Sequence, residues 1–517
     1  DLLARDLGRP LLILVPREAD ALAWIEAAEL FGGEGAAIYF PSPSLTPYQE
    51  TEVSLQVRAQ ETVALDPVYS RGARAPRAVV ATPRALFRRL PNPADFAASC
   101  LDAVPGGELP IDGLIEHLLR YGYKRTDLVF EVGDFAVRGG LVDLFPPNED
   151  EPVRLDYFGD TIESIRWFDR ETQRSEDTLD ALRILPLSPF PCGPREAADL
   201  GALLGARFEG ETSGEIAERI SDLSRLGSFP GWENYLPIAA ARTTSLAEAA
   251  PNSLVVAVDP PALLGEIRHH AERLWADWQA RVDHDKLAVP PEELERAVDE
   301  VIAEVEGAPL RIGDLVLAST RESQGIDFRG SVTDLFHGQL PRFPQEIATA
   351  RSRGDRCLVV VSASHRDRLE ELLLGREIAV GGPSGVGLVA GELRRGFRLP
   401  AAGVAIYGEQ QLLPLSKPQA RRTSRHRFGP FLSGMRDLKI GDFVVHADHG
   451  IGQLVPGPGL GRQDQHAVPF VDHRRLLGDQ VEAVPHRVAD TWAQRLRCAS
   501  AIRLRPAAVL GPVDAPP

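Results

Sequence analysis

Residues 152–169 read PVRLDYFGDTIESIRWFD, and this stretch decides how the surrounding chain folds. The dipeptide Gly159-Asp160 predicts a two-residue hairpin turn, because glycine readily adopts the positive φ that such turns require. Side chains alternate between the two faces of a strand. Alternation places three apolar side chains on one face: Val153, Leu155 and Tyr157. The opposite face receives Arg154, Asp156 and Phe158.

The apolar face must pack inward, so we expect Phe158 to be exposed between charged groups. Arginine and aromatic side chains are enriched in the hot spots of protein interfaces. Arg138, on a predicted strand at residues 135–138, could join the same face. These residue types predict a protein-docking face that includes Arg154. The alternative is an ordinary surface phenylalanine covered by a second layer of the same chain.

Four short strands lie close together around this hairpin. They are predicted at residues 135–137, 141–145, 153–158 and 162–168, after a helix at residues 111–120. Short turns between consecutive strands indicate an antiparallel sheet. We therefore predict an α+β module at residues 106–192.

The flanking segments have a different pattern, in which strands alternate with helices. Strands are predicted at residues 11–15, 36–40, 78–81 and 254–258, with helical stretches at residues 55–65 and 292–306. This alternation is typical of a parallel α/β sheet. We interpret residues 1–105 and 193–317 as two parts of one α/β domain, into which the antiparallel module is inserted.

The rest of the chain divides into smaller parts. Residues 318–415 predict a second, small α/β domain with strands at 357–361, 386–390 and 404–407. Residues 416–436 are an arginine-rich linker, and residues 437–497 predict a small β-barrel. The last part, residues 498–517, is rich in Ala, Pro and Arg, which predicts a disordered tail.

The charge of the chain is unevenly distributed. The 517 residues carry a formal net charge of −17, which argues against a nucleic-acid binder with a basic surface. Residues 415–517 nevertheless hold 15 basic and 9 acidic residues, a net charge of +6. An acidic body with a basic end region suggests two kinds of partner. The chain begins without a methionine just before a predicted strand, so we expect a fragment.

The composition excludes several classes of protein. The apolar stretches are far shorter than the ~18 residues that span a bilayer, so we expect no membrane association. The four cysteines are scattered without metal-ligand spacing, which fits a reducing cytosol. His446 and His449 lie three apart in a predicted strand, where they would point to opposite faces. We predict no metal site and no catalytic residues.

Two nucleotide motifs can be tested against the sequence. A P-loop needs a lysine followed by Ser or Thr, but the four lysines precede Arg, Leu, Pro and Ile. The second motif, Gly385-x-Gly387-x-x-Ala390 with Glu409 further on, resembles a dinucleotide fingerprint. A helix after Val386 would support that alternative, whereas a strand would exclude it.

The quoted hairpin also carries a family resemblance. Together with residues 134–147 (DFAVRGGLVDLFPP), it resembles the UvrA-contacting domain shared by the excision helicase UvrB and the transcription-repair coupling factors. Residues 11–90 are similar to the first domain of the same two families, and residues 230–237 (PGWENYLP) resemble a motif that follows it. The resemblance implies a degenerate RecA-like α/β domain around the inserted module.

Two features separate these families. UvrB has an aromatic-rich β-hairpin that grips damaged DNA, whereas the equivalent residues 41–56 here hold one aromatic, Tyr48. Residues 437–452 (DLKIGDFVVHADHGIG) resemble the RNA-polymerase-interacting domain of the coupling factors, a Tudor-like or SH3-like barrel that UvrB lacks. Residues 456–482 depart from that pattern.

The resemblance implies specific site residues and partners. The UvrA-contacting residues of the family fall on Arg138, Arg154 and Phe158. The polymerase-contacting region corresponds to His449, Gly450, Gly452 and Leu460, with the β subunit of RNA polymerase as partner. ATP, magnesium and most DNA contacts are expected in the motor domains of the family, so no cofactor is expected in this chain.

The sequence therefore predicts the recruitment portion of a bacterial, cytoplasmic and monomeric transcription-repair coupling factor. The family displaces RNA polymerase stalled at lesions by ATP-driven translocation and recruits UvrA for nucleotide excision repair. Two alternatives stay open: a fragment of a UvrB-like excision-nuclease subunit, and a dinucleotide-binding protein.

Overall fold

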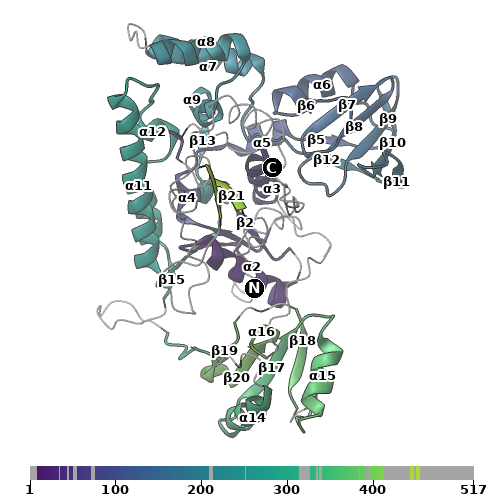
Figure 1. Ribbon diagram of the computed structural model, residues 1–517, viewed down its shortest axis with the longest axis vertical. Coiled ribbons are helices and arrows are strands. Elements are labelled where there is room, and N and C mark those ends of the chain that lie inside the picture. The colour runs from purple at the N-terminus through teal and green to yellow at the C-terminus, as the bar shows by residue number, and fades with distance from the viewer. Residues whose placement is uncertain are drawn as a thin grey trace, which may run out of the picture. The chain divides into compact units, whose positions relative to one another are not determined.

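The computed structural model describes most of the chain up to residue 412 and one later hairpin (Figure 1). The described residues are 8–412 and the segments 443–446 and 450–453. Within 8–412 the gaps are residues 34, 43–45, 50–54, 71–75, 209–213, 241, 251, 314–325, 334–335, 337–339, 383–384, 392 and 394. The fold is mixed α/β with several separate sheets, as the sequence predicts.

The first sheet has five strands, all parallel, in the order β15-β14-β1-β3-β2. They are β1 (Leu11–Leu14), β2 (Ala37–Phe40), β3 (Ala78–Ala81), β14 (Leu254–Val258) and β15 (Leu310–Ile312). Strands from before and after the antiparallel module thus pair in one sheet, with β1 hydrogen-bonded to both β3 and β14. This pairing is the arrangement expected if the module is inserted into one α/β domain.

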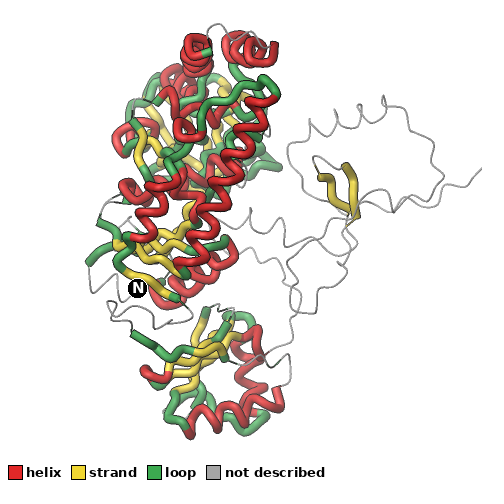
Figure 2. Tube along the Cα trace, turned by 90° about the vertical axis from the view of Figure 1, so that its left-hand side faces the viewer, coloured by secondary structure: helices red, strands yellow, loops and turns green. Residues whose placement is uncertain are grey.

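Helices cover both faces of this sheet (Figure 2). Leu11 and Ile13 pack on the side of α2 (Glu18–Gly32), whereas Leu12 and Leu14 face the opposite side. The helices that contribute side chains to that opposite side are α3 (Leu55–Tyr69), α4 (Pro83–Phe87), α5 (Pro93–Ser99), α10 (Leu246–Ala249), α11 (Pro260–Asp283) and α13 (Val298–Glu306). A strand buried on both faces needs a continuous apolar sequence, which residues 11–14 (LLIL) supply.

The inserted module is a six-stranded sheet with one helix. Its strand order is β11-β10-β9-β8-β7-β6, antiparallel except between β6 and β7. The elements are α6 (Ile111–Arg120), β6 (Lys124–Arg125), β7 (Asp134–Arg138), β8 (Leu141–Leu144), β9 (Val153–Phe158), β10 (Thr161–Phe168) and β11 (Ser175–Thr178). Gly159 has a φ of 64° in the turn between β9 and β10, as predicted. Leu114 and Leu118, one helical turn apart, pack α6 against Val153 and Leu155 of the sheet.

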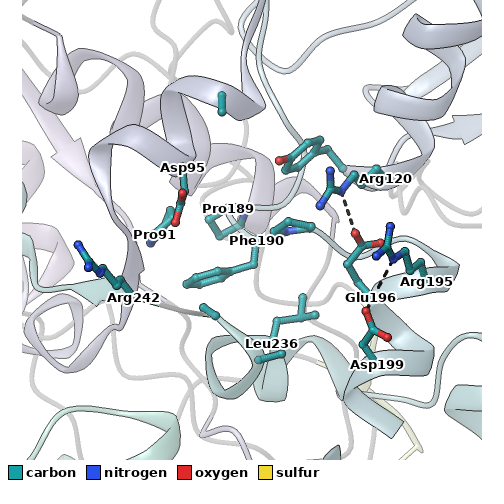
Figure 3. A pocket seen from close by; sticks show the side chains of 15 residues that line it. Pro91, Asp95, Arg120, Pro189, Phe190, Arg195, Glu196, Asp199, Leu236 and Arg242 are labelled. Carbon is teal, nitrogen blue, oxygen red and sulfur yellow. Dashed lines mark hydrogen bonds and ion pairs between the residues drawn. The ribbon is translucent and has the colours of Figure 1, made fainter. Parts of the chain in front are cut away.

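Short connections hold the module at its junction with the α/β domain. β5 (Leu101–Ala103) pairs with β12 (Leu182–Ile184) at the two ends of the insertion. Arg120 at the end of α6 forms an ion pair with Glu196 of α7 (Pro194–Arg207), with Nε and Oε1 2.8 Å apart. A cavity of about 480 Å³ lies there, between Phe190 and Leu236 and the ion pairs of α7 (Figure 3).

The residues between the module and β14 are mainly helical. They form α7, α8 (Gly214–Leu226), the 3-10 turn η2 (Trp232–Tyr235) and α9 (Leu236–Ala239), and α12 (Pro291–Leu294) follows later. Apolar side chains of α7, α8, η2, α9, α11 and α12 form their own core. A short two-stranded pairing joins β4 (Leu90–Pro91) to β13 (Thr243–Thr244). The predicted helical stretch at 292–306 is divided between α12 and α13 by residues 295–297.

The second α/β sheet has the strand order β16-β19-β20-β17-β18. Its strands are β16 (Ser331–Val332), β17 (Arg356–Val361), β18 (Gly387–Ala390), β19 (Phe397–Leu399) and β20 (Val404–Gly408). Its helices are η3 (Leu340–Arg342), α14 (Phe343–Ser352), α15 (Arg366–Leu374), η4 (Pro400–Ala402) and α16 (Glu409–Leu412). Residues 387–390 form a strand parallel to β17, so the dinucleotide-binding alternative is wrong. A phosphate-binding turn needs a helix where this strand lies.

Only one hairpin is described in the predicted barrel. β21 (Phe443–His446) and β22 (Gly450–Gln453) are antiparallel, with Val444 opposite Gly452. The linker 416–436, the tail 498–517 and the other barrel residues lie outside the described residues. The chain divides into two compact units at residue 428.

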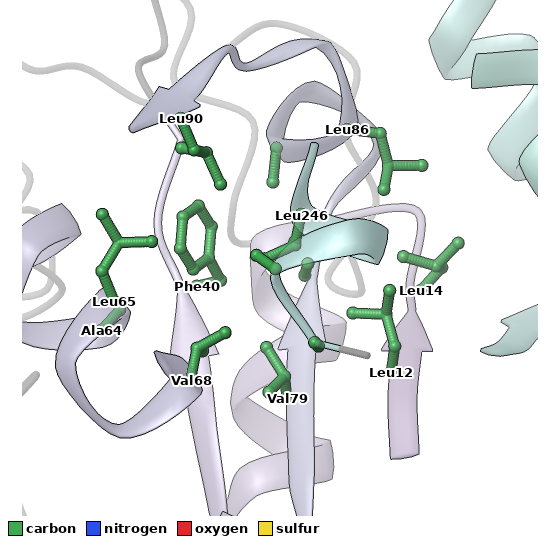
Figure 4. Close-up of a cluster of buried hydrophobic side chains, with 14 of the residues drawn as sticks. Leu12, Leu14, Phe40, Ala64, Leu65, Val68, Val79, Leu86, Leu90 and Leu246 are labelled. Carbon is green, nitrogen blue, oxygen red and sulfur yellow. The ribbon is translucent and has the colours of Figure 1, made fainter. Parts of the chain in front are cut away.

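The largest described core lies on one face of the first sheet (Figure 4). Phe40 and Leu90 have no exposed surface and lie beside Leu65 and Val68 of α3. Leu246 of α10 comes from the second part of the chain and packs with Leu12 and Val79. Both halves of the divided domain therefore share one core. Among the described residues, no helix is long and apolar enough to cross a membrane.

Candidate functional site

Phe158 is the most exposed aromatic residue among the described residues, with 76% of its surface accessible. It ends β9 immediately before the Gly159 turn. Its neighbours on the other face, Leu155 and Tyr157, are buried against the core of the module. The predicted alternation of buried and exposed side chains along β9 is therefore observed, and the exposure of Phe158 is confirmed.

Arg154 lies on the same face but is mostly buried. Its Nε and Nη2 atoms donate to the two carboxylate oxygens of Asp143, at 2.7 and 2.9 Å. Its Nη1 atom lies 3.4 Å from the carbonyl oxygen of Gln173 and 3.3 Å from Oγ of Ser175. The guanidinium also stacks 4.8 Å from the ring centre of Phe168. The Asp143 hydrogen bond raises the pKa of Arg154 above its usual value.

These contacts belong to a second, smaller core on the face opposite α6. It contains Val129, Ala136, Phe145 and Phe168, each at most 3% exposed. Residues 126–133, between β6 and β7, and residues 169–174, between β10 and β11, supply its cover. The second layer considered from the sequence therefore exists, but it covers the Arg154 end of the strand and not Phe158.

Arg138 is exposed at the end of β7. Its Nη2 atom donates to the carbonyl oxygen of Asp127 at 2.7 Å. The register places Arg138 opposite Leu141, which in turn lies opposite Asp156 of β9. Arg138 and Phe158 thus occupy the same face at the same end of the sheet, whereas the Arg154 guanidinium is held further along the strand. We name this end of the face, with Arg138 and Phe158, the hairpin surface.

The C-terminal edge of the first sheet, where α/β proteins usually bind nucleotides, is arranged differently from a phosphate site. Only three residues separate β1 from α2, and Arg17 pairs with Asp20, with Nε and Oδ2 2.9 Å apart. Glu18 and Asp20 fill the first turn of α2. Carboxylates in the first turn interact favourably with the positive end of the helix, where a bound phosphate would meet their negative charge.

The strand ends of the second sheet also hold a carboxylate. Glu409 accepts hydrogen bonds from the backbone N and the Oγ of Ser362, at 2.7 and 3.0 Å. Nδ1 of His365 lies 3.3 Å from the other oxygen of Glu409. Glu409 therefore stabilises the turn before α15. Within the described part of the chain, no group of three His, Cys, Asp or Glu side chains could hold a metal ion.

The predicted polymerase-contacting residues are only partly described. Gly450 and Gly452 lie in strand β22, opposite His446 and Val444. His449 and Leu460 lie outside the described residues. Their role stays a prediction from the family resemblance.

Sequence reasoning missed two features of the sheet face opposite α6. Asp143 is 2% exposed and is the partner of Arg154, yet an aspartate on a predicted strand gives no sign of which cation it meets. Three exposed apolar side chains in the loop between β6 and β7 were also missed: Leu128, Phe130 and Val132. Three consecutive apolar residues, Leu128, Val129 and Phe130, are typical of a buried strand, so their sequence gives no sign of an exposed loop.

Comparisons with known proteins agree with this geometry. The family described as "UvrB interaction domain" matches residues 101–190, which include β5 to β12. The transcription-repair-coupling factor of Myxococcus xanthus is 30% identical over 508 residues, covering 90% of this chain and 41% of the relative. That of Bacillus subtilis is 23% identical over 88% of this chain and 40% of the relative. That of Escherichia coli is 28% identical over 67% of this chain and 31% of the relative. The chain therefore spans about two fifths or less of the length of these relatives.

Proposed function

Because the chain is a relative of the transcription-repair-coupling factors and carries a UvrB interaction domain, we propose that it acts in transcription-coupled nucleotide excision repair. In this proposal it is a recruitment portion, which docks UvrA on the inserted module and RNA polymerase through residues 437–497. ATP-driven displacement of stalled polymerase belongs to motor domains of the family.

The exposed Phe158 is the observation that carries the UvrA proposal. A phenylalanine that is 76% exposed costs hydration free energy in the free protein, and burial against a partner recovers it. The backbone of Phe158 is held in the β9–β10 hairpin, so little backbone entropy is lost on binding. Arg138, on the same face but two strands away on β7, supplies a cation that can meet a carboxylate of the partner.

The RNA polymerase proposal rests on the second unit of the chain. The resemblance of residues 437–452 to a polymerase-interacting barrel supports it, as does the antiparallel pairing of β21 and β22. The net charge of +6 over residues 415–517 differs from the acidic body, which suggests a different partner. In the same proposal the first sheet derives from a RecA-like domain that has lost its phosphate-binding loop.

The alternative of a UvrB-like excision-nuclease subunit is less well supported. Tyr48 is the single aromatic in residues 41–56, and it is 5% exposed. Its hydroxyl donates to the carbonyl oxygen of Val289 at 2.6 Å. A ring held in this way cannot stack on a damaged base.

The test is a titration of the full chain with purified UvrA. We expect Phe158→Ala to weaken binding by about 2 kcal/mol, or roughly thirtyfold. Phe31→Ala is the matched control, because Phe31 is also exposed (54%) but lies on α2, outside the module. This variant should bind UvrA with the affinity of the unsubstituted chain. Equal affinities for the two variants would contradict the docking proposal.

A second experiment tests whether residues 437–497 bind RNA polymerase. Deletion of residues 437–497 should abolish binding to the polymerase β subunit and leave UvrA affinity unchanged. Retained polymerase binding would place that contact elsewhere in the chain.

A further inference from the structure

The cavity of about 480 Å³ at the junction of the module with the α/β domain is lined by three parts of the chain (Figure 3). The module supplies Arg120 and Tyr121 at the end of α6, and the α/β domain supplies β4 and α5. The third part consists of residues 189–191 with α7 and α9. The volume falls in the usual range of small-molecule sites, roughly 300–1,000 Å³.

The buried part of the lining is apolar. Tyr121, Phe190 and Leu236 are 7%, 6% and 4% exposed. The remaining apolar lining residues are prolines and alanines, whose side chains have no rotamers that could fill the space: Pro91, Ala98, Pro189, Pro191, Ala239 and Ala240. An aromatic ring that enters this space exchanges water for apolar contacts on several sides, which favours its binding.

Three carboxylates line the cavity, and each already has a partner within the chain. The partners are two arginines of the same lining and one side-chain amide: Arg120 for Glu196 (Nε to Oε1, 2.8 Å), Arg195 for Asp199 (Nε to Oδ2, 3.9 Å) and Asn92 for Asp95. The negative charges of the lining are therefore engaged, and two of the three lining cations are engaged with them.

Arg242 is the third cation of the lining. It is exposed, and among the residues that the structure describes it has no hydrogen-bond or ion-pair partner. In Figure 3 it lies on the other side of Phe190 from Glu196. An arginine can bind a carboxylate through two parallel hydrogen bonds, and the Arg242 guanidinium has its donors free for such a ligand.

We propose that this cavity binds a small aromatic carboxylate, with its ring against Phe190 and Leu236 and its carboxylate at Arg242. The apolar lining accounts for the ring, and the unpaired guanidinium accounts for the anion. A cationic ligand would have to displace an arginine or an amide from its carboxylate. A ligand in this cavity also contacts Tyr121 of the module, so its binding stabilises the junction as well as itself. The inference depends on neither UvrA nor RNA polymerase.

The experiment is a ligand-observed NMR titration of the full chain with indole-3-acetate. Tryptophol, indole-3-ethanol, is the uncharged probe of nearly the same shape. A ligand of this size should bind with a dissociation constant of about 1 mM. We expect indole-3-acetate to bind about fivefold more tightly than tryptophol, the contribution of an ion pair at an exposed arginine. Equal affinities would overturn the choice of a carboxylate, and an absence of saturation by either probe would overturn the site.

Substitutions in the lining locate the bound probe. Arg242→Gln should abolish the preference for indole-3-acetate, whereas Arg242→Lys retains the charge and should keep part of it. Ala98→Trp adds a bulky ring to the lining from an exposed position of α5 and should prevent binding of both probes. Arg268→Gln is the matched control, because Arg268 is also an exposed arginine but lies on α11, outside the lining. Both affinities should be unchanged in this control.

Thermal unfolding provides an independent readout. Saturating indole-3-acetate should raise the melting temperature of the unsubstituted chain, because a ligand that binds only the folded state stabilises it. The same concentration should leave the melting temperature of the Ala98→Trp variant unchanged, and melting without ligand shows that each variant is folded. If folded Ala98→Trp binds the probes as the unsubstituted chain does, or if folded Arg242→Gln keeps the preference for the carboxylate, the inference is wrong.

Discussion

Arg154 and Phe158 show how two residues on one strand face can have different roles. Both were predicted to contact a partner, and both lie on the face opposite α6. Phe158 is exposed, whereas Arg154 uses its donors within the chain on Asp143, Gln173 and Ser175. We therefore expect the contribution of Arg154 to docking to come largely through the shape of this face.

Replacement of Arg154 tests this distinction. Arg154→Ala leaves the carboxylate of Asp143, which is 2% exposed, without its cation. Breaking a buried ion pair in this way should lower the free energy of unfolding by about 3–5 kcal/mol. Phe158→Ala should change it by less than about 0.5 kcal/mol, because the side chain is exposed. Urea denaturation of both variants measures the difference.

A double variant provides the control for this prediction. Asp143→Leu combined with Arg154→Met removes both charges and should recover most of the lost stability. If Arg154→Ala proved as stable as the unsubstituted chain, the ion pair would not stabilise the module.

At the scale of elements, a side-chain cap marks where the short helix α10 begins. Ser245 and Glu248 form a capping box at α10: the Glu248 backbone N donates to Oγ of Ser245 at 3.2 Å, and the Ser245 backbone N donates to Oε2 of Glu248 at 2.9 Å. The backbone hydrogen bond from Ser245 and the hydroxyl of Thr244 lower the pKa of Glu248 below its ordinary value. A helix of four residues depends strongly on such a cap.

This pKa predicts a dependence of stability on pH. A carboxyl whose pKa is lower in the folded state stabilises the protein above its unfolded pKa, ~4.3, and loses that contribution as pH falls through the folded value. Glu248→Gln should therefore cost about 0.5 kcal/mol at pH 7, a small value because the group is exposed. The difference from the unsubstituted chain should shrink below pH ~4.3. A constant difference down to pH 3 would contradict the assignment.

A buried amide joins three strands of the second sheet. Gln411 has no exposed surface, and its Oε1 accepts from the backbone N atoms of Gly396 and Gly408, at 2.8 and 2.9 Å. Its Nε2 donates to the carbonyl oxygen of Thr333 at 3.0 Å. Residues 333, 396 and 408 adjoin or end β16, β19 and β20, so this one side chain fixes the end of the sheet.

Replacement of Gln411 should therefore destabilise the second α/β domain. Gln411→Leu leaves buried backbone donors without acceptors, at about 1–3 kcal/mol for each unsatisfied group. We expect a total loss of about 3 kcal/mol in the free energy of unfolding. Gln345→Leu, at an exposed position of α14, is the matched control and should be nearly neutral. Equal denaturation midpoints would show that Gln411 is dispensable.

At the scale of the whole molecule, the matched module lies between the two parts of one α/β sheet in the sequence. The UvrB interaction domain match covers residues 101–190. The segments before and after it pair with each other through β1 and β14, and β5 pairs with β12 near the two ends of the match. The nucleotide-binding edge of that domain carries Arg17, Glu18 and Asp20.

We therefore predict that this chain does not hydrolyse ATP. The turn after β1 has no lysine, and the acids in the first turn of α2 would repel a triphosphate. Phosphate release measured with ATP, magnesium and DNA should equal that of a blank without protein. Release that rises with protein concentration and persists after repurification would contradict this prediction.

Much of the fold could be predicted because it depends on local patterns. Strands β3, β9 and β14 and helix α6 begin and end at the predicted residues, since apolar alternation, helical spacing and turn glycines all act within a few residues. The long helix α11 was not predicted as a unit, because its apolar side chains are widely spaced among charged residues. The strand predicted at residues 386–390 forms as β18, whereas its parallel pairing with β17 is seen only in the folded sheet.

Strand alternation and the Gly159 turn predict the exposure of Phe158, which the fold confirms. The roles of the two arginines depend on contacts that exist only in the folded chain. Arg154 meets Asp143 because β8 pairs with β9 in one register, and Arg138 meets the Asp127 carbonyl because residues 126–133 fold back over the sheet. A long cationic side chain can reach many acceptors, so its partner is chosen by the strands and loops that surround it. Exposure follows from the periodicity of one strand, whereas pairing depends on segments that meet only in the folded chain.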